Sequence, residues 1–94
     1  MKKKGWKDFL MLCRHAQSDE ELQALLSLLL TLDEQEQLAT RVELLRSLLQ
    51  EEKPQRAIAQ ELGISIAKIT RGSNALKIVA PSLRAYLKTE LLNQ

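Results

Sequence analysis

Residues 55–77 read QRAIAQELGISIAKITRGSNALK, and their spacing is that of a helix-turn-helix. The first helix of such a motif needs a small residue where the second helix crosses it closely, and Ala59 meets that need. Four positions later the chain must take a positive φ, which Gly63 does without steric cost. Ser65 is a good N-cap for the second helix. Apolar side chains recur where the two helices must pack on each other and on the rest of the protein: Ile58, Leu62, Ile64 and Ile69.

The helix that follows Ser65 is predicted to have two different faces, because successive residues of a helix are 100° apart. Ile66, Ile69, Ser73 and Leu76 gather on the inner face. Ala67, Thr70, Arg71 and Asn74 gather on the outer face. Small and polar side chains on an exposed helix suit the major groove of DNA, where the helix must approach the base edges closely. An ordinary solvated face is the alternative.

Gly72 lies where a typical recognition helix carries an apolar residue. Glycine inside a helix costs about 1 kcal/mol relative to alanine, so the position needs a reason. Close approach to another element is one reason, and the gap beside Arg71 could hold a flat anionic ligand. Tight helix packing without a ligand is the alternative, and the residues leave both open.

Three helices are predicted before the motif. Residues 6–13 carry apolar side chains at helical spacing (Trp6, Phe9, Leu10 and Cys13), and this helix should end near Ser18. A second helix is expected over residues 21–30, with leucines around nearly its whole circumference, so protein must surround it. The leucines are Leu22, Leu25, Leu26, Leu28, Leu29 and Leu30.

Thr31 and Glu34 form a capping box that predicts the start of a third helix. This helix should run to about Glu51 and end at Lys53 and Pro54, since the residue before a proline is pushed out of the α region. Its expected buried stripe is Leu38, Val42, Leu45 and Leu49.

The composition favours a single all-α domain, with 94 residues of which 45% are hydrophobic, three glycines and two prolines. A chain of this size buries roughly 60 to 65% of its unfolded surface. It can hardly surround the helix at residues 21–30 alone, so we infer that a second copy covers it. The single Cys13 and the absence of a secretory-type start predict a cytoplasmic protein. The longest apolar stretch, residues 22–32, is shorter than the ~20 residues that span a bilayer.

Neither an enzyme nor a metal site is predicted. His15 is the only histidine, and no carboxylate pair or nucleophile with its base stands out. Cys13 and His15 lie two positions apart on a helix and so point in different directions.

Charge is distributed unevenly along the chain. Residues 1–52 hold seven Lys/Arg against ten Asp/Glu, whereas residues 53–94 hold seven against two, which gives −3 and +5. The basic half therefore contains the helix-turn-helix. A second basic cluster, Lys2 to Lys4 with Lys7, suggests a short disordered arm that reaches a polyanion, or else a solvated tail.

The segment TRGSNALK (residues 70–77), which follows the helix-turn-helix and a long helix containing LATRV (residues 38–42), resembles the tryptophan repressor family. The similarity runs from Trp6 to about Leu92. It implies six helices per chain in an intertwined homodimer, with helices four and five reading DNA. A sixth helix is expected from Pro81, a favourable first helical residue. It should bury Leu83, Leu87 and Leu91.

This resemblance implies a division of the single domain, residues 1–94, into three parts. Residues 1–52 would be the dimerisation core with its basic arm, and residues 79–94 a C-terminal dimerisation helix. Residues 53–78 would carry the helix-turn-helix, and we call them the head.

L-tryptophan is the co-repressor that the resemblance implies, wedged between head and core so that the two recognition helices of a dimer stand one DNA turn, roughly 34 Å, apart. Arg41 and Arg71 match the arginines that sandwich the indole ring, and Arg71 can also pair with the ligand carboxylate. Thr31 matches a hydroxyl near that carboxylate, although its capping role competes. The other matched positions are Leu28 and Leu30, whose carbonyls would accept from the ammonium, and the pocket walls Leu45 and Gly72.

Ala75 departs from the best-known form of the family, which has a serine whose hydroxyl meets the ammonium. Losing a hydrogen bond to a charged group would weaken binding by about 1.5 to 3 kcal/mol unless water or a carbonyl substitutes.

Positions at or near the operator in this family match Gln55, Arg56, Ala59, Ile66, Ala67 and Thr70. Arg56 can reach a guanine edge or a phosphate, and Ala67 and Thr70 can face bases. Ile66 also fits the core. Lys53, Lys68 and Lys77, with Lys2 to Lys4, are expected to hold phosphates and make binding salt-dependent.

The function expected is a tryptophan-dependent transcriptional repressor that binds a palindromic operator in double-stranded DNA and controls tryptophan biosynthesis or transport genes. A repressor-like regulator that uses another ligand or none is the first alternative. A helical dimer used only for protein contacts is the second.

Overall fold

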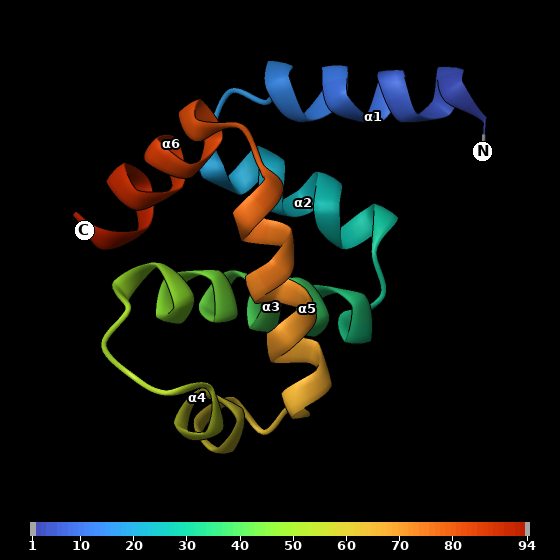
Figure 1. Cartoon of the computed structure of the whole chain (residues 1–94). Coiled ribbons are helices and arrows are strands. Elements are labelled where there is room, and N and C mark those ends of the chain that lie inside the picture. Colours follow the sequence, from blue (N-terminus) through green and yellow to red (C-terminus); the bar gives the residue numbers. More distant parts are fainter. Residues whose placement is uncertain (1, 94) are drawn as a thin grey trace. The chain divides into compact units, whose positions relative to one another are not determined.

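The structure is a computed structural model that describes residues 2–93. Within these residues it has six helices and no strand: α1 (Lys3–His15), α2 (Asp19–Leu29), α3 (Leu32–Gln50), α4 (Gln55–Leu62), α5 (Ile66–Ile78) and α6 (Pro81–Leu92) (Figure 1). The predicted all-α class with six helices is confirmed. No described helix combines the length and the apolar character needed to cross a membrane.

The chain divides into two compact units, one up to Glu36 and one from Gln37 onward. The first unit contains α1, α2 and the first turn of α3. The second contains the rest of α3 with α4, α5 and α6.

In the first unit, α1 begins earlier than the sequence indicated. Lys3 and Lys4 are helical, and the Lys4 ammonium lies 3.4 Å from the Asp8 carboxylate one turn later. The predicted disordered arm is therefore wrong for these two lysines, because the helix extends over them. The rings of Trp6 and Phe9 pack with their centroids 5.4 Å apart.

The first unit also corrects a helix boundary. α1 ends at His15, and Ser18 caps α2, with its hydroxyl accepting from the Glu21 amide at 3.1 Å. Asp19, Glu20 and Glu21 fill the first turn of α2, where the helix dipole favours negative charge.

The predicted capping box at the start of α3 is confirmed. The Thr31 amide donates to the Glu34 carboxylate at 2.9 Å, and the Glu34 amide donates to the Thr31 hydroxyl at 3.1 Å. Two amides that the helix leaves open are satisfied in this way.

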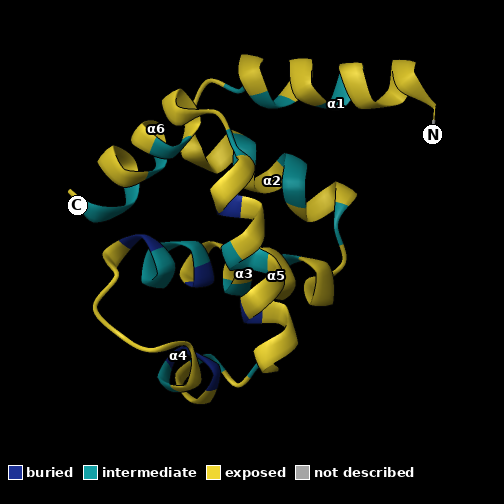
Figure 2. Cartoon of the chain, in the orientation of Figure 1, coloured by how far each residue is buried: buried dark blue, intermediate teal, exposed yellow. Residues whose placement is uncertain are grey.

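The core of the second unit is formed by residues of α3, α4 and α5, and Figure 2 shows buried segments of these three helices in dark blue. Leu44, Ile58, Ala59 and Ile69 form it, and Leu48, Leu62 and Ile64 pack around it. Ile58 and Ile69 are 1% and 0% exposed.

The predicted buried stripe of α3 is partly wrong. Leu49 is buried and Leu45 half-buried, but Leu38 and Val42 are exposed. Leu44 is buried in their place. Its side chain packs against Gly72 of α5, which has no side chain to fill that space. Leu38 and Val42 lie on a side that one chain does not cover.

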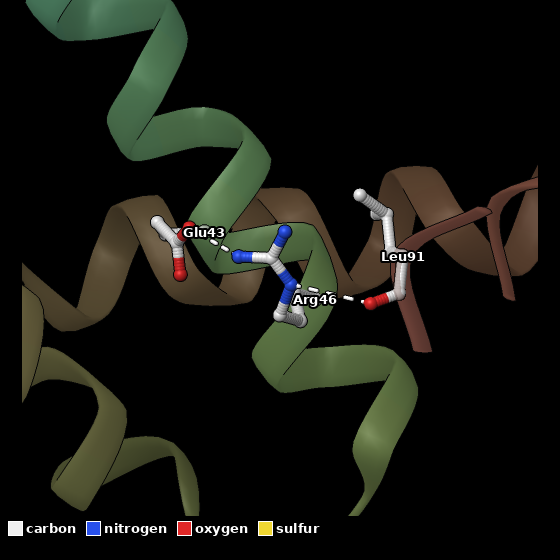
Figure 3. A network of polar contacts seen from close by, with 3 residues as sticks. All are labelled: Glu43, Arg46 and Leu91. Carbon is white, nitrogen blue, oxygen red and sulfur yellow. Dashed lines mark hydrogen bonds and ion pairs between the residues drawn. The ribbon is translucent and has the colours of Figure 1, made fainter. Parts of the chain in front are cut away.

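Two arginines connect α6 to its neighbours. Arg46 of α3 pairs with Glu43 and donates from Nε to the Leu91 carbonyl at 3.4 Å (Figure 3). Arg84 of α6 donates to the Leu76 carbonyl at 3.3 Å. Both carbonyls lie in the last turn of their helix, where no amide of the same helix can donate to them. Each arginine therefore gives such a carbonyl a hydrogen-bond partner.

α6 begins at Pro81 as predicted. Its apolar residues are less covered than predicted, since Leu83 is exposed and Leu87 and Leu91 are only half-buried. Their full burial stays an expectation for the dimer.

Glu51, directly after α3, has a φ of 55°, a value that residues other than glycine rarely adopt. Replacing Glu51 with glycine should raise the free energy of unfolding by about 0.5 to 1 kcal/mol, because glycine takes this conformation without steric strain. Urea unfolding at a fixed protein concentration measures the change. Gln50→Gly, one residue earlier and inside the helix, is the control and should lower stability by about as much. A loss of stability in Glu51→Gly would contradict the expectation.

Candidate nucleic-acid interface

The turn between α4 and α5 has the geometry that the sequence predicted. Gly63 takes the left-handed conformation at φ 66° and ψ 36°, and its amide donates to the Ala59 carbonyl. The Ile64 amide donates to the same carbonyl at 3.1 Å. The Ser65 hydroxyl accepts from the Lys68 amide at 3.2 Å and caps α5.

Close packing joins α4 to α5. The two helices contact each other directly, through Ile58 and Ile69. Ala59 is also buried in this contact. Its packing role is thus supported, but a buried methyl group is not available to DNA, so we no longer count Ala59 among the DNA-contacting side chains.

The outer face of α5 is open. Ala67, Thr70, Arg71 and Asn74 are all exposed, as are Lys68 and Lys77. Ile66, which the sequence placed on either face, is 48% exposed and belongs to the outer one. Residue 66 is the first of the helix, so it lies beyond the part of α5 that packs on the core.

Two polar contacts within the head were not predicted. The Thr70 hydroxyl donates to the Gln55 side-chain carbonyl at 3.4 Å and so joins α5 to the first residue of α4. Lys53 pairs with Glu61 at 2.7 Å. Helical periodicity gives no signal for either contact, because the partners are 15 and 8 residues apart. Arg56, the other cation expected at DNA from α4, is exposed.

Gly72 is a point of close helix packing. A Cβ built there would lie 3.0 Å from Cδ2 of Leu44 and 3.6 Å from Cδ1 of Leu48, both on α3, and Figure 1 shows α5 running across α3. The space that the glycine leaves is therefore occupied by Leu44. This favours tight packing, the alternative left open by the sequence, over an empty slot at residue 72.

The other ligand-site candidates are distributed over both units. In the second unit Arg41, Arg71 and Ala75 are exposed and Leu45 is half-buried. In the first unit Leu28 and Thr31 are exposed and Leu30 is half-buried, and Thr31 serves the capping box. Among the described side chains, no group of three or more His, Cys, Asp or Glu could hold a metal ion.

A capped second helix, a left-handed glycine turn and an outer face of small and basic residues together define a helix-turn-helix protein of the DNA-binding kind.

Comparison with known proteins identifies the family. The sequence pattern described as Trp repressor protein matches residues 4–91. The chain belongs to the Trp repressor family, and the resemblance found in the sequence is confirmed. It is 46% identical over 87 residues to a protein of Chlamydia trachomatis serovar D named Trp operon repressor homolog, covering 93% of each chain.

Proteins from other bacteria have the same name. One from Vibrio campbellii is 43% identical over 88 residues, covering 94% of this chain and 88% of its own. One from Histophilus somni (strain 2336) is 44% identical over 86 residues, covering 92% and 81%. The family is one of transcriptional regulators, so the coarser functional prediction, a transcriptional repressor related to tryptophan, is confirmed.

Proposed function

We propose that the chain is a homodimeric repressor that binds a palindromic operator in double-stranded DNA with L-tryptophan as co-repressor, and so controls genes of tryptophan biosynthesis or transport. It would act in the cytoplasm, without enzymatic activity and without a metal. The observation that carries the proposal is the α4–α5 head, whose outer face is exposed and basic. Membership in the Trp repressor family supplies the ligand and the operator by analogy.

A second copy of the chain is part of the proposal because large apolar side chains stay exposed in the single chain. Leu28 is 81% and Leu32 79% exposed, and Leu38, Val42 and Leu83 are also open. Large exposed apolar areas mark sites of protein association, and obligate dimer interfaces are rich in apolar residues. We keep residues 1–52 and 79–94 as the proposed dimerisation parts and 53–78 as the head.

The proposed ligand site combines Arg41 and Arg71 around the indole ring, Thr31 near the carboxylate, the carbonyls of Leu28 and Leu30 near the ammonium, and Leu45, Gly72 and Ala75 as walls. The proposed DNA contacts are Gln55, Arg56, Ile66, Ala67, Lys68, Thr70 and Lys77. Helix α5 would enter the major groove with its outer face.

The test measures binding of purified protein to palindromic duplexes, with half-sites one helical turn apart, by fluorescence anisotropy with and without L-tryptophan. We expect L-tryptophan to tighten binding by about 5- to 150-fold, the usual range of coupling between two ligands. Exchange of both Arg56 and Thr70 for alanine should abolish preference for one duplex over another. Equal affinity with and without L-tryptophan would refute the co-repressor role.

Two observations favour a second candidate, a repressor of this family that uses another ligand or none. Ala75 lacks the hydroxyl expected near the ammonium, and Leu44 occupies the space beside Gly72. Calorimetric titration with L-tryptophan, indole and indole acids separates the two candidates. A protein that is used only for protein contacts would instead keep its activity when Arg56 and Thr70 are replaced.

A further inference from the structure

The ion pair between Lys53 and Glu61 ties the loop after α3 to the end of α4. Nζ of Lys53 lies 2.7 Å from Oε2 of Glu61, and the two side chains are 44% and 53% exposed. Lys53 directly precedes Pro54, the N-cap of α4, and Glu61 is the penultimate residue of that helix. The pair therefore links the last turn of α4 to the loop that precedes this helix.

Few other local interactions stabilise the N-terminal end of α4. It is eight residues long, its N-cap Pro54 makes no side-chain capping hydrogen bond, and its first turn carries no acidic residue. Helices this short are marginal without tertiary support. Glu61 stands in the last turn, where the helix dipole disfavours negative charge, and Lys53 offsets that charge.

Glu61 is also the only acidic residue between positions 53 and 89. A carboxylate in a basic head that reads DNA repels the phosphates, unless a cation of the protein offsets its charge. Its placement against Lys53 neutralises both charges at one corner of the head.

We propose that Lys53 is a positioning residue that fixes α4 through Glu61, and that it does not hold a DNA phosphate. The proposal rests on the proposed DNA-binding function, and it replaces our sequence-based expectation for Lys53. The Lys53 ammonium is paired with the Glu61 carboxylate of its own chain, so it does not release counterions from DNA on binding. Phosphate contacts fall instead to those proposed DNA-contacting cations that form no ion pair among the described residues: Arg56, Lys68 and Lys77.

The experiment compares variants by the slope of log binding constant against log salt concentration, with a random-sequence 30-base-pair duplex as probe. The double variant Lys53→Met with Glu61→Gln removes the pair without changing net charge. Its slope should equal that of the original protein, while its affinity falls about two- to fivefold at every salt concentration. Lys68→Met is the matched control, and its slope should be less steep by about 0.9, the loss of one phosphate contact.

A swapped pair gives the rescue. Lys53→Glu with Glu61→Lys places both charges on the favourable ends of the α4 dipole and should restore the affinity lost in the double variant. A slope reduced by about 0.9 in the double variant would overturn the proposal, because Lys53 would then be a phosphate contact. Unchanged affinity in the double variant, or no recovery in the swapped pair, would overturn it as well.

Hydrogen exchange separates this proposal from the DNA-binding function itself. α4 amides should exchange about two- to fivefold faster in the double variant and return to their original rates in the swapped pair. If the original protein binds no duplex at any salt concentration, the DNA-binding function fails, and exchange rates alone decide the positioning role. Exchange that is unchanged by the double variant would then overturn it.

Discussion

Ala75→Ser is expected to raise the affinity for L-tryptophan by about 10- to 100-fold. At the proposed ligand site the serine hydroxyl would accept a hydrogen bond from the ammonium, and hydrogen bonds to charged groups contribute about 1.5 to 3 kcal/mol. Residue 75 is exposed on α5, one turn after Gly72, so the new hydroxyl meets no packing obstacle in the single chain. Calorimetric titration measures the effect.

Indole-3-propionic acid is the control ligand for this variant, because it has the ring and the carboxylate but no ammonium. Its affinity should be the same for both proteins. Ala75→Cys is the control variant, since its side chain is similar in size to serine but its sulfur is only a weak acceptor for the ammonium. If serine improves tryptophan and indole-3-propionic acid equally, the hydroxyl does not act on the ammonium and the assignment of residue 75 is wrong.

Ile69→Ala is expected to lower the free energy of unfolding by about 2 to 5 kcal/mol, the range for isoleucine in a closed core. Ile69 is 0% exposed and is shared by the contacts of α5 with α4 and with Leu44 of α3. Its loss leaves a cavity at the centre of the second unit. Denaturant unfolding at a fixed protein concentration measures it, because association with a second copy would make stability depend on concentration.

The matched control is Ile66→Ala, three residues earlier in the same helix. Ile66 is 48% exposed, so its removal should change stability by less than about 1 kcal/mol. Equal losses in the two variants would show that the inner and outer faces of α5 are assigned wrongly. DNA binding should respond in the opposite order, since only Ile66 lies on the proposed interface.

The sequence predicted those features that depend on a few neighbouring residues. The capping box at Thr31 and Glu34, the left-handed Gly63 and the start of α6 at Pro81 all appear in the structure. Each is set within about one helical turn, by one hydrogen bond or one restricted φ. The helix-turn-helix follows from such local signals, whereas the family follows from the resemblance of residues 70–77 and 38–42.

Contacts between helices could not be predicted in this way. Leu44 is buried where Leu38 and Val42 were expected, and its side chain fills the space beside Gly72. Lys53 pairs with Glu61, and Thr70 with Gln55. A periodic pattern gives the apolar face of a helix only to within a residue or two, whereas the crossing of two helices selects which side chain enters the core. Local chemistry therefore determined the elements and the head, and tertiary packing decided which residues of that head are left free to meet a ligand or DNA.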